Sequence, residues 1–323
     1  MTGPMADPVA YGALELEWGR RDAGAWESLF AGIECSSLEQ SWAYGEALAR
    51  VESCRVHRAV VADRGRPLAV VQAFEKGRFL PVTPVRIQRG PLWLVPDPSP
   101  DLRRRVFGLI KRQFRLGRRK LLVWSPELPA GAESQALMRS CGMRQMVTGH
   151  STALLDLTKP AEDLRAGLHG KWRNALTCAE RSGLSTRLAA GGRTFDWLVD
   201  RCDSERRRRG FVGTPGNLVR ALAAAAPLKD DVLVLTAAAD RERLAGVLLF
   251  RHGNTATYLL GWNSPEGRRH RAHNLLLWRA VLELRERQVG WLDLGGVNPA
   301  ASGVARFKLG MSQGLRTLAG TFI

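Results

Sequence analysis

The chain has 323 residues, which is enough for one large domain or for two of about 150 residues each. Its formal net charge of +17 comes almost entirely from arginine. Such a surplus favours an anionic partner, such as a phosphorylated small molecule, RNA or a membrane surface; a merely basic surface is the alternative. No run approaches 18 consecutive apolar residues, so we expect no membrane-spanning segment.

Several classes of site lack their motifs. The five cysteines form no CxxC pair, which argues against a disulfide framework or a zinc site and favours reduced thiols. The first twelve residues lack a signal-peptide pattern, so we expect a cytoplasmic protein. Neither G-x-S-x-G nor a P-loop is present, which disfavours serine hydrolases and NTPases. His270 and His273 lack a carboxylate partner at a metal-binding spacing, and no metal is assigned.

The first half alternates strands and helices. Residues 58–76 predict a hairpin around the turn "RGRP", and residues 85–95 predict a further strand. Residues 100–117 have the spacing of an amphipathic helix, and residues 119–128 that of a buried strand. The order is hairpin, strand, helix, strand.

The second half repeats this order about 180 residues later. Residues 230–253 predict a hairpin around "ADRER", and residues 254–265 a strand. Residues 274–288 predict a helix and residues 289–296 a buried strand. The repetition indicates a duplicated α/β domain with mixed sheets, antiparallel at each hairpin and parallel across each helical crossover.

A connecting segment lies between the two copies. Residues 154–157 predict a short strand and residues 160–182 a helix with acids early and bases late, which suits the helix dipole. We therefore place the domain boundary near residue 150 and predict two domains, residues 1–150 and 151–323.

Four segments occur in an order that resembles one protein family. They are "SLEQSWAYGEAL" (37–48), "QRGPLW" (88–93), "LHGKWRNALTCAERSGL" (168–184) and "WLDLGGVNPAASGVARFKLGM" (291–311). Together they resemble the FemABX family of Fem-like GNAT proteins. The resemblance implies two tandem GNAT-type acyltransferase domains. It also implies amide formation, which the best known members carry out by moving an amino acid from aminoacyl-tRNA onto a peptidoglycan precursor.

The chain departs from those members in the first half. A lysine that often follows their first tryptophan holds a nucleotide diphosphate, and Gly45 and Glu46 occupy the nearby positions here. The chain has only three tyrosines and lacks a coiled-coil arm. The acceptor therefore stays open.

The closing segment contains the candidate catalytic residues. Acyl transfer requires a carbonyl held about 3 Å from an amine and donors for the tetrahedral oxyanion. We expect Lys308, at the end of a strand and oriented by Phe307, to stabilise that charge or to neutralise a donor phosphate, and the resemblance implies the same. A lysine that only extends to solvent is the alternative. Asp293 is either the proton acceptor for the amine or a hydrogen-bond acceptor for the following turn.

The predicted substrate-binding residues are mostly basic. GNAT proteins bind pyrophosphate at the junction formed here by residues 263–274, but the usual glycine pattern is missing, which disfavours acyl-CoA. Arginines and a histidine supply charge there instead, and a solvated basic loop is the alternative. The resemblance implies an acceptor phosphate near Lys171 and Arg173, with a solvated helix face as the alternative. The full set is Phe307, Lys171, Arg173, Arg268, Arg269, Arg271, His270, Trp262 and Tyr258. Arg89 and Gly90 are expected to shape a turn rather than to bind.

These patterns lead to one main hypothesis and two alternatives. The first is a transferase that moves an aminoacyl group from aminoacyl-tRNA, or an acyl group, onto an amine of a phosphorylated or anionic acceptor, without a cofactor. The second is an N-acyltransferase that uses acyl-CoA in a cofactor, lipid or polysaccharide pathway. The third is a non-catalytic basic protein that binds RNA or another anion. The oligomeric state is open.

Overall fold

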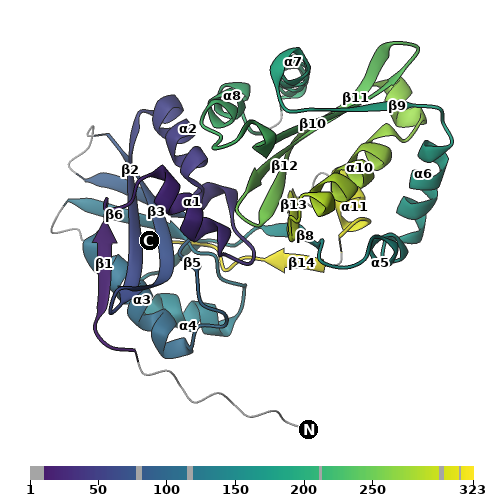
Figure 1. Ribbon diagram of the computed structural model, residues 1–323. Helices are drawn as coiled ribbons and strands as arrows, with labels where there is room; N and C mark the ends of the chain where they lie inside the picture. The colour runs from purple at the N-terminus through teal and green to yellow at the C-terminus, as the bar shows by residue number, and fades with distance from the viewer. Residues whose placement is uncertain (1–10, 78–81, 115–118, 211–212, 298–301, 313) are drawn as a thin grey trace, which may run out of the picture.

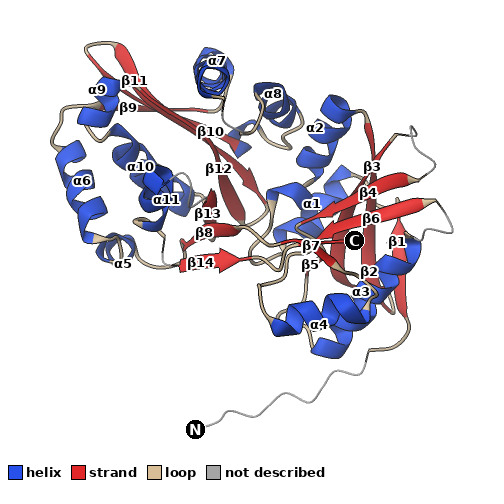
Figure 2. Cartoon of the chain, turned by 180° about the vertical axis from the view of Figure 1, so that it is seen from behind, coloured by secondary structure: helices blue, strands red, loops and turns tan. Residues whose placement is uncertain are grey.

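The computed structural model describes residues 11–77, 82–114, 119–210, 213–297, 302–312 and 314–323. The chain forms two mixed β-sheets with helices packed on them (Figure 1 and Figure 2). The first sheet consists of strands from the first half and of one strand from the end of the chain, and the second sheet consists of strands from the second half. This confirms the predicted α/β class with two tandem GNAT-like units.

The first sheet is antiparallel except for one pair. Its strand order is β1-β2-β3-β4-β6-β15-β7, β5 pairs with β3, and β4 and β6 are parallel. The strands are β1 (Leu14–Trp18), β2 (Cys54–Asp63), β3 (Arg66–Lys76), β4 (Thr83–Gln88), β5 (Leu92–Trp93), β6 (Lys120–Ser125), β7 (Gln145–Val147) and β15 (Thr321–Phe322). Its helical segments are α1 (Ala23–Ala31), η1 (Leu38–Gln40), α2 (Trp42–Glu52), α3 (Pro100–Gln113) and α4 (Ala132–Ser140).

The second sheet repeats the arrangement. Its order is β14-β8-β13-β12-β11-β10-β9, and β12 and β13 are the parallel pair. The strands are β8 (Ser151–Asp156), β9 (Ser185–Ala189), β10 (Val232–Ala239), β11 (Glu242–His252), β12 (Thr255–Asn263), β13 (Trp291–Val297) and β14 (Gly314–Thr317). Its helical segments are α5 (Ala161–Ala166), α6 (Gly170–Glu180), α7 (Gly192–Arg209), α8 (Gly216–Ala224), η3 (Lys229–Asp231), α9 (Pro265–Arg269), α10 (Ala272–Glu286) and α11 (Ser302–Leu309).

Helix α3 illustrates how the sequence produces these layers. Ser99 caps its start by accepting from the Leu102 N–H, and Pro100 occupies the first turn. Its buried side chains recur at helical spacing, and the Phe107 ring stacks on Trp124 of β6 at 4.8 Å. Burying such an aromatic side chain contributes about 1.5–3 kcal/mol, which fixes the helix on the sheet.

Three predicted elements were wrong in form. The single strand expected over residues 85–95 is two strands, β4 and β5, because the chain turns at Arg89, which has a positive φ. The segment expected to be one helix over residues 160–182 is two helices, α5 and α6, because Gly167 ends the first and the His169 ring accepts the Lys171 N–H at the start of the second. The chain around Lys308 is not a strand but the helix α11.

The two halves of the chain contact each other at three places. The turn between β11 and β12 meets the segment after α1, where Ser36 donates from its N–H to Thr255 Oγ1 and from its hydroxyl to the His252 carbonyl. Helices α2 and α8 pack together, and their apolar residues belong to one core cluster. Strand β15, at the end of the chain, pairs with β6 and β7 of the first sheet. The proposed boundary at residue 150 stays a prediction.

Candidate active site

Two parallel strands separate at the centre of the second sheet. Strands β12 and β13 pair from Thr255 and Trp291 to Thr257 and Asp293, and the described parts of both strands continue beyond that point without pairing to each other. Strand β13 also has an irregularity after Asp293, where Gly295 has a positive φ of 78°. The separation leaves a fork whose backbone groups can hydrogen-bond an extended ligand.

The side chain of Lys308 lies at this fork. Its Nζ donates to the Gly296 carbonyl at 2.9 Å, and a Cβ added to Gly295 would lie 3.5 Å from Nζ and 3.7 Å from the Tyr258 carbonyl. Lys308 therefore contacts the β13 arm of the fork, and it does so from α11 and not from a strand as the sequence predicted. Residues 298–301 of the predicted glycine-rich turn lie outside the described residues. Burial lowers the pKa of Lys308, and the charge of Asp293 acts in the opposite direction.

Phe307 fixes α11 against the core. Its ring centroid lies 5.8 Å from that of Trp172 in α6 and 6.2 Å from that of His273 in α10. The ring packs against the core of the second half. This packing supports the expectation that Phe307 orients Lys308; direct contact of Phe307 with substrate stays a prediction.

Asp293 joins the fork to the first half of the chain. Its carboxylate accepts from Arg89 Nη1 at 2.9 Å, from the Thr152 hydroxyl and from the Gly295 N–H. Arg89 also donates to both carboxylate oxygens of Glu127, at 2.6 and 3.0 Å. Burial alone would raise the pKa of Asp293, but the charge of Arg89 and these hydrogen bonds outweigh it and lower the pKa.

This environment favours the structural interpretation of Asp293. A carboxylate with a lowered pKa and three donors is a weak proton acceptor. Its catalytic role stays a prediction. Arg89, expected only to shape a turn, has the left-handed backbone of a turn residue (φ 52°) and is in addition the cation that pairs with Asp293.

Sequence reasoning missed other charged residues of this network. Glu127 follows β6, and Arg316 of β14 contacts it at 3.2 Å. Glu39 has a buried Oε2 without a hydrogen-bond partner among the described residues, and burial raises its pKa, which the charge of Arg89 only partly offsets. The available signal was the same for Glu127 as for Asp293: an acidic residue at a buried strand requires a cationic or donor partner.

The basic segment after β12 is not an open loop. It contains the short helix α9, capped by Ser264, in which Glu266 pairs with Arg269 and with His270. A Cβ on Gly267 would meet the Leu244 carbonyl at 2.6 Å, so this glycine permits close packing on β11.

Two arginines of that segment are arranged differently. Arg268 is exposed, and Arg271 precedes α10 in a left-handed conformation. Binding of an anion by any of these residues stays a prediction. Arg269 and His270, whose side chains are engaged by Glu266, support it less than Arg268 and Arg271 do.

The two basic residues of α6 have different environments. Arg173 Nη1 donates to the carbonyls of Ala166 and Leu168, so it closes the end of α5. Lys171 is exposed on the same helix, one residue before the Trp172 that contacts Phe307. Lys171 is thus the more exposed of the two, and phosphate binding by either residue stays a prediction.

The structure separates the two aromatic residues of β12. A β-bulge opposite Leu248 and Leu249 interrupts the alternation of the strand. Tyr258 packs on the α10 side, and Trp262 packs on the α7 side, where its ring meets Trp197 at 5.5 Å and Arg201 at 5.3 Å. They therefore do not form one contiguous surface, although both lie on an arm of the fork.

Three further findings concern metal ligands, cysteines and membrane-spanning helices. The described residues contain no group of three or more His, Cys, Asp or Glu side chains placed to hold a metal ion. All five cysteines are free. No helix in the described parts of the chain is both long and apolar enough to cross a membrane.

Comparisons with known proteins agree with this geometry. Residues 163–309 match a family described as "Acetyltransferase (GNAT) domain". The structure of FemX has a TM-score of 0.80 with this chain, at 14% identity, over 95% of this chain and 96% of that one. A structure named L-PGS from Bacillus licheniformis has a TM-score of 0.54, at 13% identity, over 93% and 91%.

A third similar structure is that of a tandem GNAT protein. It is described as a tandem GNAT protein from the clavulanic acid biosynthesis pathway, and it has a TM-score of 0.51, at 15% identity, over 95% and 98%. No curated protein sequence matches the chain. The matched domain and the tandem fold define the class: the protein is an acyltransferase of the GNAT fold. Its tandem arrangement is Fem-like, as the sequence predicted.

Proposed function

We propose that the protein forms an amide by transferring an aminoacyl group from aminoacyl-tRNA to an amine. The observation that carries the proposal is the Lys308 ammonium at the fork between β12 and β13, where it donates to the Gly296 carbonyl of β13. An acyl carbonyl bound in the fork would place its oxygen near this donor. The amine nitrogen then attacks the carbonyl carbon, the ester bond to the tRNA ribose breaks, and the amine proton leaves with the ribose oxygen or with water.

Two features support aminoacyl-tRNA over acyl-CoA as the donor. The strand-to-helix junction that would bind pyrophosphate contains α9, whose Gly267 is packed on β11 and whose Glu266 pairs with Arg269 and hydrogen-bonds the His270 ring. The net charge of +17 suits a polyanionic donor. Such a donor would place the reaction in the cytoplasm, and an anionic acceptor is consistent with the exposed Lys171 and Arg268.

Acyl-CoA as the donor is the second candidate. The match of residues 163–309 to a GNAT acetyltransferase domain favours it. The two donors can be separated by what the purified protein retains: tRNA enriched in one or a few isoacceptors supports the first proposal, and bound CoA without tRNA supports the second. Retention of RNA without turnover on any amine would favour the non-catalytic alternative.

Replacement of Lys308 tests the role of the fork. Transfer of a radiolabelled aminoacyl group from charged total tRNA to a panel of amines should fall about 100-fold or more in Lys308→Met, because the oxyanion loses its charged donor. Lys308→Arg should retain part of the activity. Lys229→Met, an exposed lysine in η3, is the matched control and should retain full activity. Full activity of Lys308→Met would refute the assignment.

A further inference from the structure

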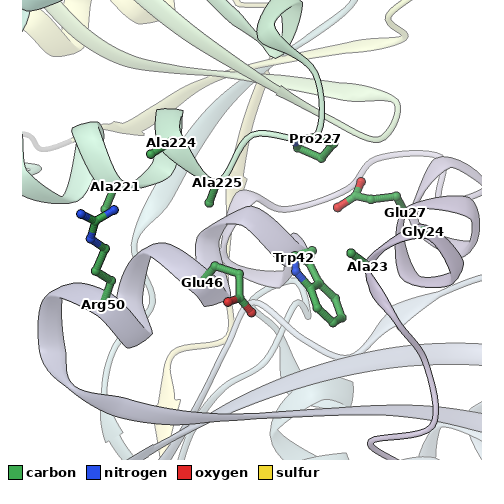
Figure 3. Close-up of a pocket in the computed structure, with 10 residues that line it drawn as sticks. All are labelled: Ala23, Gly24, Glu27, Trp42, Glu46, Arg50, Ala221, Ala224, Ala225 and Pro227. Atoms are coloured by element: carbon green, nitrogen blue, oxygen red, sulfur yellow. The ribbon is translucent and has the colours of Figure 1, made fainter.

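A second site lies at the junction of the two halves. A cavity of about 670 Å³ opens between α1, α2 and the end of α8, within the usual size range of small-molecule sites. None of its lining residues belongs to β12, β13 or α11, so it is separate from the fork. The lining consists of Ala23, Gly24, Glu27, Trp42, Glu46, Arg50, Ala221, Ala224, Ala225 and Pro227 (Figure 3).

Glu27 supplies an unsatisfied acceptor at one end of this cavity. Its Oε1 is buried and has no hydrogen-bond partner among the described residues. Burial raises the pKa of Glu27, and the charge of Asp231 raises it further. The backbone N–H of Trp42 and the charge of Arg58 oppose this only in part. A buried acceptor without a donor is costly, and a ligand ammonium would supply the missing donor.

Trp42 and Glu46, between the two ends, are held in place by Arg58. The Arg58 guanidinium lies 3.6 Å from the centroid of the Trp42 ring and donates to Glu46 at 2.9 Å and to Gln72 Oε1 at 2.7 Å. The Glu46 charge is thus compensated within the protein, and the indole is oriented before any ligand arrives. Of the two carboxylates that line the cavity, Glu27 is therefore the one with an oxygen that has no partner among the described residues.

Arg50 provides the opposite charge at the other end. Figure 3 shows Arg50 and Glu27 on opposite sides of the cavity, with Trp42 and Glu46 between them. The side chain of Arg50 is exposed, and it makes no hydrogen bond or ion pair to the described residues. The α8 wall between the two ends consists of alanines, whose small side chains leave room for an aliphatic chain.

We propose that this cavity binds an amphoteric aliphatic compound whose ammonium group pairs with Glu27 and whose acidic group pairs with Arg50. The hydrocarbon body lies along Trp42 and Ala224. The charges of Glu27 and Arg50 at the two ends disfavour a plain anion, which Glu27 repels, and a plain hydrocarbon, which leaves Glu27 unpaired. Between them the Glu46 charge is already compensated by Arg58. The proposal concerns binding alone and does not depend on the transfer reaction.

Isothermal titration calorimetry with ω-amino acids from 4-aminobutanoate to 8-aminooctanoate tests this proposal. We expect at least one member to bind, and the amine and the acid of the same chain length to bind at least tenfold more weakly. Glu27→Gln should weaken binding of the amino acid about 10- to 100-fold, the range for a lost charged hydrogen bond. Glu27→Gln should leave the free protein at least as stable as the wild type, because it removes an uncompensated carboxylate.

Two further variants and one control complete the test. Ala224→Leu should weaken binding because the larger side chain occupies the wall along which the aliphatic chain lies. Arg50→Gln should abolish the preference for the amino acid over the amine. Glu34→Gln, an exposed glutamate after α1, should bind like the wild type. The proposal would be overturned if no ω-amino acid of any chain length bound to the wild type. It would also be overturned if Glu27→Gln and Ala224→Leu bound the amino acid as tightly as the wild type does.

Discussion

The ion pair between Arg89 and Asp293 leads to a quantitative prediction. Their side chains are 9% and 5% exposed, so the pair is shielded from solvent. The change Arg89→Met leaves Asp293 and Glu127 as buried carboxylates that have lost a shared cation. Removing one partner of such a pair costs about 3–5 kcal/mol, largely because the remaining charge stays desolvated. We therefore expect the free energy of unfolding to fall by about 4 kcal/mol.

Urea unfolding, followed by tryptophan fluorescence and by circular dichroism, measures this change, and coincident transitions would justify a two-state treatment. Arg104→Met is the matched control, because Arg104 pairs with Asp101 on the surface and such pairs contribute about 0–1 kcal/mol. Adding Asp293→Asn to Arg89→Met should cost less than Asp293→Asn alone, since the partner is already absent. An effect of Arg89→Met no larger than that of Arg104→Met, or strict additivity of the two changes, would refute the reasoning.

Two other predictions concern pH and the helix α6. The pKa of Asp293 is lowered in the folded state, so its contribution to stability is complete above its unfolded pKa of about 3.9 and is lost as the pH falls through the folded value. Urea midpoints measured from pH 5 to pH 3 should therefore fall more steeply for the wild type than for Asp293→Asn, and parallel profiles would contradict this. Arg173→Gln should lower stability by about 1 kcal/mol because it opens the end of α5. Lys171→Gln should leave thermal unfolding unchanged, and equal losses in both variants would contradict the distinction.

The repeated order of elements could be predicted because it depends on local patterns. Each half shows a hairpin turn, a strand and an amphipathic helix within a short stretch of chain. The pairing of β15 with the first sheet could not be predicted, since two residues at the end of the chain carry no periodicity of their own. The helix α11 was misread because it has only eight residues, among them a glycine and a valine, which weaken a helical pattern.

The Arg89 and Asp293 pair shows what single-sequence reasoning can and cannot reach. The two residues are 204 positions apart, so no local spacing connects them. Each was nevertheless noticeable as a charged residue at a strand otherwise rich in apolar residues, where burial demands a partner. Burial of a charged residue therefore predicts that it has a partner. The identity of that partner follows only from the three-dimensional arrangement of the two sheets.

The location of this pair bears on why two GNAT-like units form one protein. Asp293 is the last residue of β13 that pairs with β12, and its carboxylate holds the Gly295 N–H immediately before the strand reaches Lys308. Arg89, from the first half, fixes that carboxylate. Asp293 thus receives a cation from the first half as well as donors from the second half, Thr152 and Gly295. An isolated second half would retain Lys308 but would leave Asp293 without its cation, and we expect the geometry at the fork to change as a result.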